Sequence, residues 1–115
     1  MDPVYVMRSY IIDIGTYSLA EQAGMFCEVL KEQLGGDFGL FEGTAFMYWA
    51  DEPYEIDFIW DAGDVRIKLA FMGDPDNSVW SVIGGKNRFR GTIGRDMNES
   101  CRMFLGSVAA LSKDQ

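Results

Sequence analysis

Apolar side chains recur at helical spacing in two stretches of the chain. The first stretch, residues 18–34, opens with a capping box formed by Ser18 and Glu21 and stops at a pair of glycines. The second begins at Asp96, with Glu99 as its capping partner, and runs close to the end of the sequence. We predict two amphipathic helices, and the single apolar stripe of each must be buried against another element.

The remaining segments have the composition of β-strands. Residues 4–13 are rich in Val, Ile and Tyr, and we predict that they form a first strand. The other predicted strands are residues 44–50, 55–61, 65–71 and 78–83, with a short last strand at 88–93. The sequence therefore predicts an α+β fold in one domain, residues 1–115. Its single antiparallel sheet has about five to six strands and two amphipathic helices packed on one face, in the order β-α-β-β-β-β-(β)-α.

Alternation is clearest in the predicted hairpin of residues 55–61 and 65–71. Pairing Asp61 with Asp64 across the turn would place Asp57 opposite Lys68 on a wet face. On the same register, the apolar side chains would face one another on the core side: Trp60 with Val65, Phe58 with Ile67, and Ile56 with Leu69.

Length and composition indicate a soluble globular protein. The chain has 115 residues, of which 48% are hydrophobic and 24% charged, enough for one core. Arg8 and Ser9 interrupt the first apolar stretch, so we predict no signal peptide, and no apolar run is long enough to cross a bilayer. Cys27 and Cys101 fall on the apolar sides of the predicted helices, as reduced core residues do. We expect a cytoplasmic protein that does not bind membranes.

The sequence offers little chemistry. It contains no histidine, which excludes histidine-dependent nucleophiles and histidine metal sites. Residues 84–87 (Gly-Gly-Lys-Asn) fail the phosphate-loop pattern, since Trp80 stands where its first glycine should be. Residues 74–78 resemble the start of a calcium loop but lack its glycine and its bidentate glutamate, which favours a polar turn. We predict no cofactor and no metal, which leaves carboxylates as the only acid–base groups.

Charge is distributed unevenly along the chain. Residues 1–85 contain 15 acidic and 4 basic side chains, whereas residues 86–102 contain 5 basic and 2 acidic ones. The net charge of −8 argues against a nucleic-acid partner and favours a basic protein, although such a charge also serves solubility alone. Arg88 and Arg90 lie on one face of a predicted strand, where they would form ion pairs with acidic residues of the sheet itself.

Two neighbouring segments supply the candidate site. The glycine-rich loop of residues 35–43 carries large apolar side chains, which either plug the edge of the core or anchor a partner. The next feature is the acidic run of residues 51–57. We predict a partner-binding surface made of Phe38, Phe41, Asp51, Glu52, Tyr54, Glu55 and Asp57.

These features rank three functional hypotheses. The first is a non-catalytic inhibitor or antagonist that occludes a basic partner protein, a profile shared as a class by toxin-immunity proteins, phage inhibitors and secretion chaperones. The second is a small-ligand carrier or sensor with Trp49, Trp60 and Trp80 around a cavity. The third is a carboxylate-dependent enzyme. A homodimer through a free sheet edge is left open.

Overall fold

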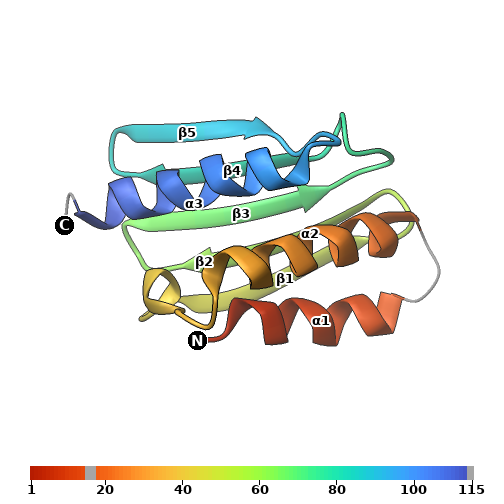
Figure 1. Cartoon of the computed structure of the whole chain (residues 1–115), viewed down its shortest axis with the longest axis horizontal. Coiled ribbons are helices and arrows are strands. Elements are labelled where there is room, and N and C mark those ends of the chain that lie inside the picture. Colours follow the sequence, from red (N-terminus) through yellow and green to blue (C-terminus); the bar gives the residue numbers. More distant parts are fainter. Residues whose placement is uncertain (15–17, 114–115) are drawn as a thin grey trace.

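The computed structural model describes residues 1–14 and 18–113 and confirms the α+β class (Figure 1). One five-stranded antiparallel sheet follows two helices, and a third helix closes the chain. The elements are α1 (Pro3–Ile14), α2 (Ser18–Leu34), the 3-10 turn η1 (Gly39–Phe41), β1 (Ala45–Asp51), β2 (Glu55–Asp61), β3 (Val65–Phe71), β4 (Val79–Gly84), β5 (Asn87–Thr92) and α3 (Met97–Lys113).

The predicted first strand is wrong, because residues 4–13 belong to helix α1. Two signals of a helix start stand just before this segment: Pro3 occupies the first helical position, and the Asp2 carboxylate accepts hydrogen bonds from the backbone N–H groups of Val4 and Tyr5 at 3.0 and 3.1 Å. Val4 and Met7 are buried on one face of the helix. Capping and helical spacing therefore outweigh the strand-like composition, and the element order is α-α-β-β-β-β-β-α.

The other predicted elements are confirmed to within a residue or two. Helix α2 spans Ser18–Leu34, and the Asp96 carboxylate caps α3 by accepting a hydrogen bond from the backbone N–H of Glu99 at 3.1 Å. The register of the β2–β3 hairpin is displaced by two residues, since Asp61 pairs with Arg66 and not with Asp64. Its side chain holds the longer turn by accepting a hydrogen bond from the backbone N–H of Gly63 at 3.0 Å. A shift of two positions leaves every side chain on its predicted face.

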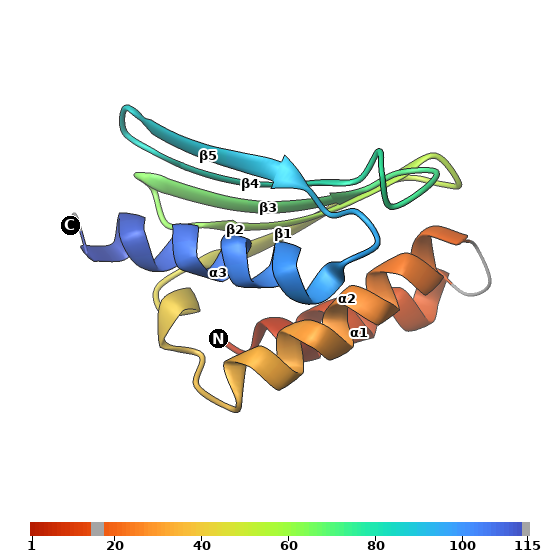
Figure 2. The same ribbon diagram turned by 45° about the horizontal axis from the view of Figure 1, so that its top comes forward.

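Helices α1, α2 and α3 lie on one side of the sheet, and within residues 1–14 and 18–113 no layer covers the other side (Figure 2). The strand order is β1-β2-β3-β4-β5, so each strand pairs with its neighbours in sequence. Helix α3 packs on β4 and β5, α2 lies beside it, and α1 packs against α2. Tyr10 of α1 reaches the sheet by stacking on Tyr48 of β1, with ring centroids 4.2 Å apart. None of the helices in the described part of the chain is long and apolar enough to span a membrane.

Inward-facing side chains of the sheet form the core with the helices. Trp60 of β2 and Trp80 of β4 are buried, and Phe104 of α3 packs edge-on against Trp80 at a centroid distance of 6.2 Å. A buried polar contact fixes the far end of the sheet to α2: Gln22 donates a hydrogen bond to the Gly73 carbonyl and accepts one from the Ser78 hydroxyl, both at 3.1 Å. Residues 74–78 thus form a polar turn between β3 and β4.

Gly91 of β5 allows the Trp80 indole to lie directly across its backbone. A Cβ atom at Gly91 would be 2.7 Å from the indole nitrogen, closer than any normal contact. The glycine is therefore required by packing in the middle of a strand, where it would otherwise weaken the sheet.

We expect Gly91→Ala to lower the free energy of unfolding by about 1–3 kcal/mol, because the buried Trp80 ring has to move. Gly106→Ala is the matched control: its Cβ would meet no atom within 4 Å, and alanine in a helix interior gains up to about 1 kcal/mol over glycine. Urea denaturation measures both. Equal effects of the two substitutions would contradict this account of Gly91.

Candidate functional site

The open face of the sheet is the surface that the helices leave uncovered. Its side chains alternate with those of the core, so it is formed by every second residue of each strand. On β1 this places Met47 and Trp49 in solvent, with 40% and 49% of their surface exposed. Large apolar groups on an uncovered sheet face are typical of an interaction surface.

The predicted acids gather at one end of this face, around the β1–β2 hairpin. Asp51 pairs with Glu55 across the hairpin, and the backbone N–H of Tyr54 donates a hydrogen bond to the Asp51 carbonyl at 2.7 Å. Tyr54 is 71% exposed, and Asp51 and Glu52 are also exposed. We call Trp49, Asp51, Glu52, Tyr54 and Glu55 the acidic corner.

Asp57 belongs to the same face but is only 5% exposed. Lys68 of β3 approaches one of its oxygens at 3.4 Å, while the other oxygen has no hydrogen-bond partner. Asp57 is therefore a buried, internally paired charge rather than an exposed contact. Partial burial, followed by the proximity of the Asp57 carboxylate, raises the pKa of Glu55.

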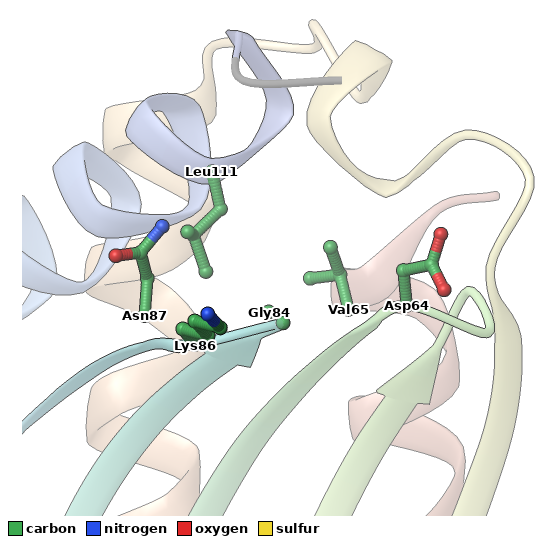
Figure 3. Close-up of a pocket in the computed structure, with 7 residues that line it drawn as sticks. Asp64, Val65, Gly84, Lys86, Asn87 and Leu111 are labelled. Atoms are coloured by element: carbon green, nitrogen blue, oxygen red, sulfur yellow. The ribbon is translucent and has the colours of Figure 1, made fainter.

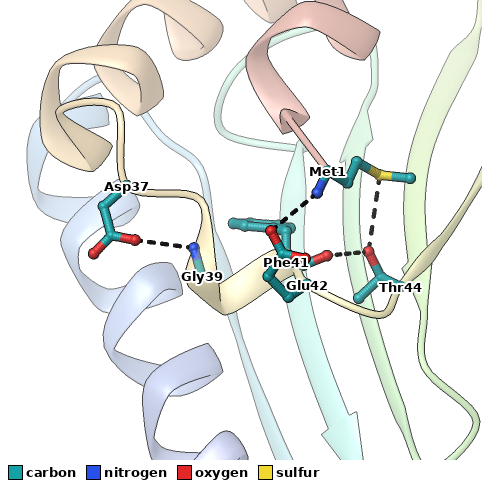
Figure 4. Close-up of polar contacts among 6 residues, drawn as sticks. All are labelled: Met1, Asp37, Gly39, Phe41, Glu42 and Thr44. Atoms are coloured by element: carbon teal, nitrogen blue, oxygen red, sulfur yellow. Dashed lines mark hydrogen bonds and ion pairs between the residues drawn. The ribbon is translucent and has the colours of Figure 1, made fainter.

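The two phenylalanines of the glycine-rich loop, both predicted to bind a partner, have different environments in the structure. Phe41 is fully buried and packs edge-on against Trp60 at a centroid distance of 5.2 Å, whereas Phe38 is half-buried. Figure 4 shows the polar contacts that hold this loop: Asp37 accepts a hydrogen bond from the backbone N–H of Gly39 at 3.0 Å, and the Thr44 hydroxyl donates one to the Phe41 carbonyl at 2.7 Å. The structure thus assigns Phe41 to the core, the alternative that the sequence left open, and brings neither ring to the acidic corner.

The three tryptophans proposed for a ligand cavity do not come together. Trp60 and Trp80 are buried in the core, while Trp49 lies on the opposite face of the sheet. Figure 3 shows a surface hollow at the end of the sheet, between the β2–β3 and β4–β5 turns and the last turns of α3. The glycines and lysine of residues 84–87 form the tight β4–β5 turn at this hollow.

Metal and thiol chemistry have little support among residues 1–14 and 18–113. No group of three or more His, Cys, Asp or Glu side chains in this part of the chain is placed to hold a metal ion. Burial raises the pKa of Cys27 to about 11 and that of Cys101 to about 12. Both thiols therefore stay protonated near neutral pH and are weak nucleophiles.

Comparison of the chain with known protein families, curated proteins and solved structures finds no match. The arrangement of the open face is consequently the basis for any functional proposal.

Met47 and Trp49 were missed as surface residues by the sequence analysis. Apolar residues occupy both faces of β1, so its composition does not indicate which face is exposed. Alternation with Phe46 and Tyr48, which face the helices, is the signal that places Met47 and Trp49 together on the other side.

We expect Phe41→Ala to cost about 3–5 kcal/mol of stability, because it removes a buried ring and leaves a cavity against Trp60. Phe38→Ala, in the same loop, should cost less than about 1.5 kcal/mol, since that ring is only half-buried. Thermal or urea unfolding of the two variants makes the comparison. A larger loss for Phe38→Ala would reverse this assignment of the loop.

The raised pKa of Glu55 predicts a pH dependence of stability. The folded chain holds this proton more tightly than the unfolded chain, so stability falls as pH rises from the ordinary glutamate value of 4.5 through the raised one. Glu55→Gln removes the ionisable group and should melt at a higher temperature than the wild type at pH 7 but not at pH 4. Glu52→Gln, which removes the same charge from the adjacent turn, should not reproduce this profile.

Proposed function

We propose that this protein is a non-catalytic binding domain that captures a basic partner protein through the acidic corner and occludes it, in the manner of an immunity or antagonist protein. The exposure of Trp49 on a sheet face that no described helix covers, next to a hairpin that carries the exposed Tyr54 and three carboxylates, carries the proposal. In this proposal the residues that anchor the partner are Trp49 and Tyr54, in place of the two loop phenylalanines that the sequence predicted.

Aromatic and acidic side chains of this kind suit arginine and lysine. Tryptophan and tyrosine rings attract a guanidinium or ammonium group over their faces, and a carboxylate binds a guanidinium through two hydrogen bonds. Tyrosine and tryptophan are also the residues that most often dominate the energetics of interfaces. The net charge of −8 adds long-range attraction for a basic protein and repels nucleic acid.

Partner capture in the cytoplasm is part of the proposal. Cys27 and Cys101 are free and buried, which suits a reducing compartment.

The carboxylate-enzyme hypothesis has one observation in its favour: partial burial, and then the nearby Asp57 carboxylate, raise the pKa of Glu55. We prefer the binding function because Lys68 already engages Asp57, and because the pair lies on an open sheet face rather than in an apolar pocket. An activity that is abolished by Glu55→Gln with the fold intact would favour the enzyme.

The binding function is tested by comparing baits in a lysate of the native host. We expect the wild-type bait to retain a basic protein, and we expect the Trp49→Ala and Glu52→Lys/Glu55→Lys baits to lose it. The wild-type chain and this protein, once purified, should form a one-to-one complex. Its association rate should fall at least tenfold between low and physiological salt, because the attraction acts between exposed charges.

Two control baits test whether the position of a substitution matters, and not merely the change in net charge or the loss of an exposed apolar side chain. Glu21→Lys/Glu32→Lys makes the same charge change on the exposed surface of α2, and Met25→Ala removes an exposed apolar side chain of that helix. Both should retain the partner. Equal losses from the α2 variants, or an association rate indifferent to salt, would contradict the proposal.

A further inference from the structure

The open face carries a second group of uncompensated charges, distant from the acidic corner. Arg88 and Arg90 point from β5 onto this face and border a groove whose floor is formed by Val79, Ser81 and Ile83 of β4. Among the described residues, neither arginine takes part in an ion pair. We call Arg88 and Arg90 the basic corner.

The other ion pairs on this face neutralise charges within the sheet itself. Arg66 pairs with Asp61 at 2.8 Å, and Lys68 pairs with Asp57 at 3.4 Å. The open face therefore presents net negative charge at the β1–β2 hairpin and net positive charge on β5, with a nearly neutral centre.

The strand register places the two corners at opposite ends of a diagonal. Reading across the sheet, Arg88 lies in the row of Ile83, Arg66 and Asp61, at one end of the strands. Asp51 and Glu55 pair in the row at the other end, three rows away. With strands about 4.8 Å apart and about 3.3 Å per residue along each strand, the face is roughly square, about 20 Å on a side.

We propose that the open face is the interface of a symmetric homodimer, in which a second copy of this chain packs face to face on the first. The two-fold axis lies between the sheets, along the diagonal that does not join the corners. This rotation places Asp51 over Arg88 of the second copy and Glu55 over Arg90 of the second copy. Because the contact is isologous, each ion pair occurs twice.

The same rotation also matches apolar groups. Ala45, Ile59 and Val79 lie along the axis, where each residue faces the same residue of the second copy. On the lattice given by the register, Trp49 falls over Ile83 of the second copy. The strands of the two sheets cross at about 90°, one of the two arrangements in which sheets pack on each other.

A second copy fits this face better than an unrelated acidic ligand does. An acidic peptide would neutralise only Arg88 and Arg90 and would leave Asp51 and Glu55 unpaired, whereas the symmetric partner satisfies both corners at once. A face of this size belongs to the small class of protein interfaces, so the dimer should be weak and dissociate on dilution. A basic partner at the acidic corner would compete with it.

Charge reversal and mixing test the dimer. We expect sedimentation at low salt to show monomer at about 1 µM and dimer at about 500 µM, a range that brackets the affinity of small interfaces. Arg88→Glu/Arg90→Glu and Asp51→Arg/Glu55→Arg should each shift the midpoint at least tenfold toward monomer, because like charges then face each other. An equimolar mixture of the two variants should dimerise again, since every acid then faces a base.

Lys31→Glu/Arg102→Glu is the control, with two exposed cations on α2 and α3 reversed, and it should dimerise like the wild type. A monomer at all concentrations, no rescue on mixing, or a dimer unaffected by both reversals would overturn the proposal.

The inference does not rest on the proposed function. Arg88→Glu/Arg90→Glu should abolish the dimer yet retain the basic partner in the bait experiment, so a failure of one proposal can be told from a failure of the other.

Discussion

The apolar side chains that β2, β3 and β4 direct toward α2 and α3 hold the two layers of the molecule together. Trp60, Phe58 and Leu69 are fully buried there. Strand alternation sends the intervening residues to the opposite side, and since α1, α2 and α3 are all used on the first side, none of the residues that the structure describes covers the second. The one-sided core is thus the reason that Met47 and Trp49 face solvent, and the interaction surface is a direct result of how the sheet is packed.

The charges on that face follow a simple arrangement. Two ion pairs, Arg66 with Asp61 and Lys68 with Asp57, neutralise charges within the face, and the uncompensated groups are the acids on the β1–β2 hairpin and the arginines on β5. A basic protein of another kind would be attracted to one corner of this face, the acidic one. A second copy of the chain would be attracted to both corners. The two proposals describe competing occupants of one surface, and a weak self-association would keep the aromatic groups covered until a stronger partner arrives.

Much of the fold can be predicted from sequence patterns, and the misses have physical causes. Helices α2 and α3 and the β2–β3 hairpin carry strong periodicity and clear end signals, so their positions were predicted within two residues. Residues 4–13 were misassigned because strand propensity was weighed above the Asp2 and Pro3 start signal. For the site, the cluster of acidic residues in the sequence was enough to predict the acidic hairpin. Phe41 and Asp57, however, are buried by tertiary packing, which a local sequence pattern does not reveal. Trp49 was predicted to line a ligand cavity with Trp60 and Trp80, but it lies on the opposite face, which depends on the sheet as a whole.

The meander order of the strands has a bearing on how the chain assembles during synthesis. Each strand pairs with one that has just preceded it, so the sheet can grow hairpin by hairpin without waiting for distant segments. The inward surfaces of β4 and β5, however, are covered by α3, which is synthesised after them. At roughly 5–20 residues per second, the ribosome would leave these apolar surfaces bare for about a second or more. In that interval both faces of β4 and β5 are exposed to solvent, and their inward-facing apolar side chains are a natural substrate for a chaperone.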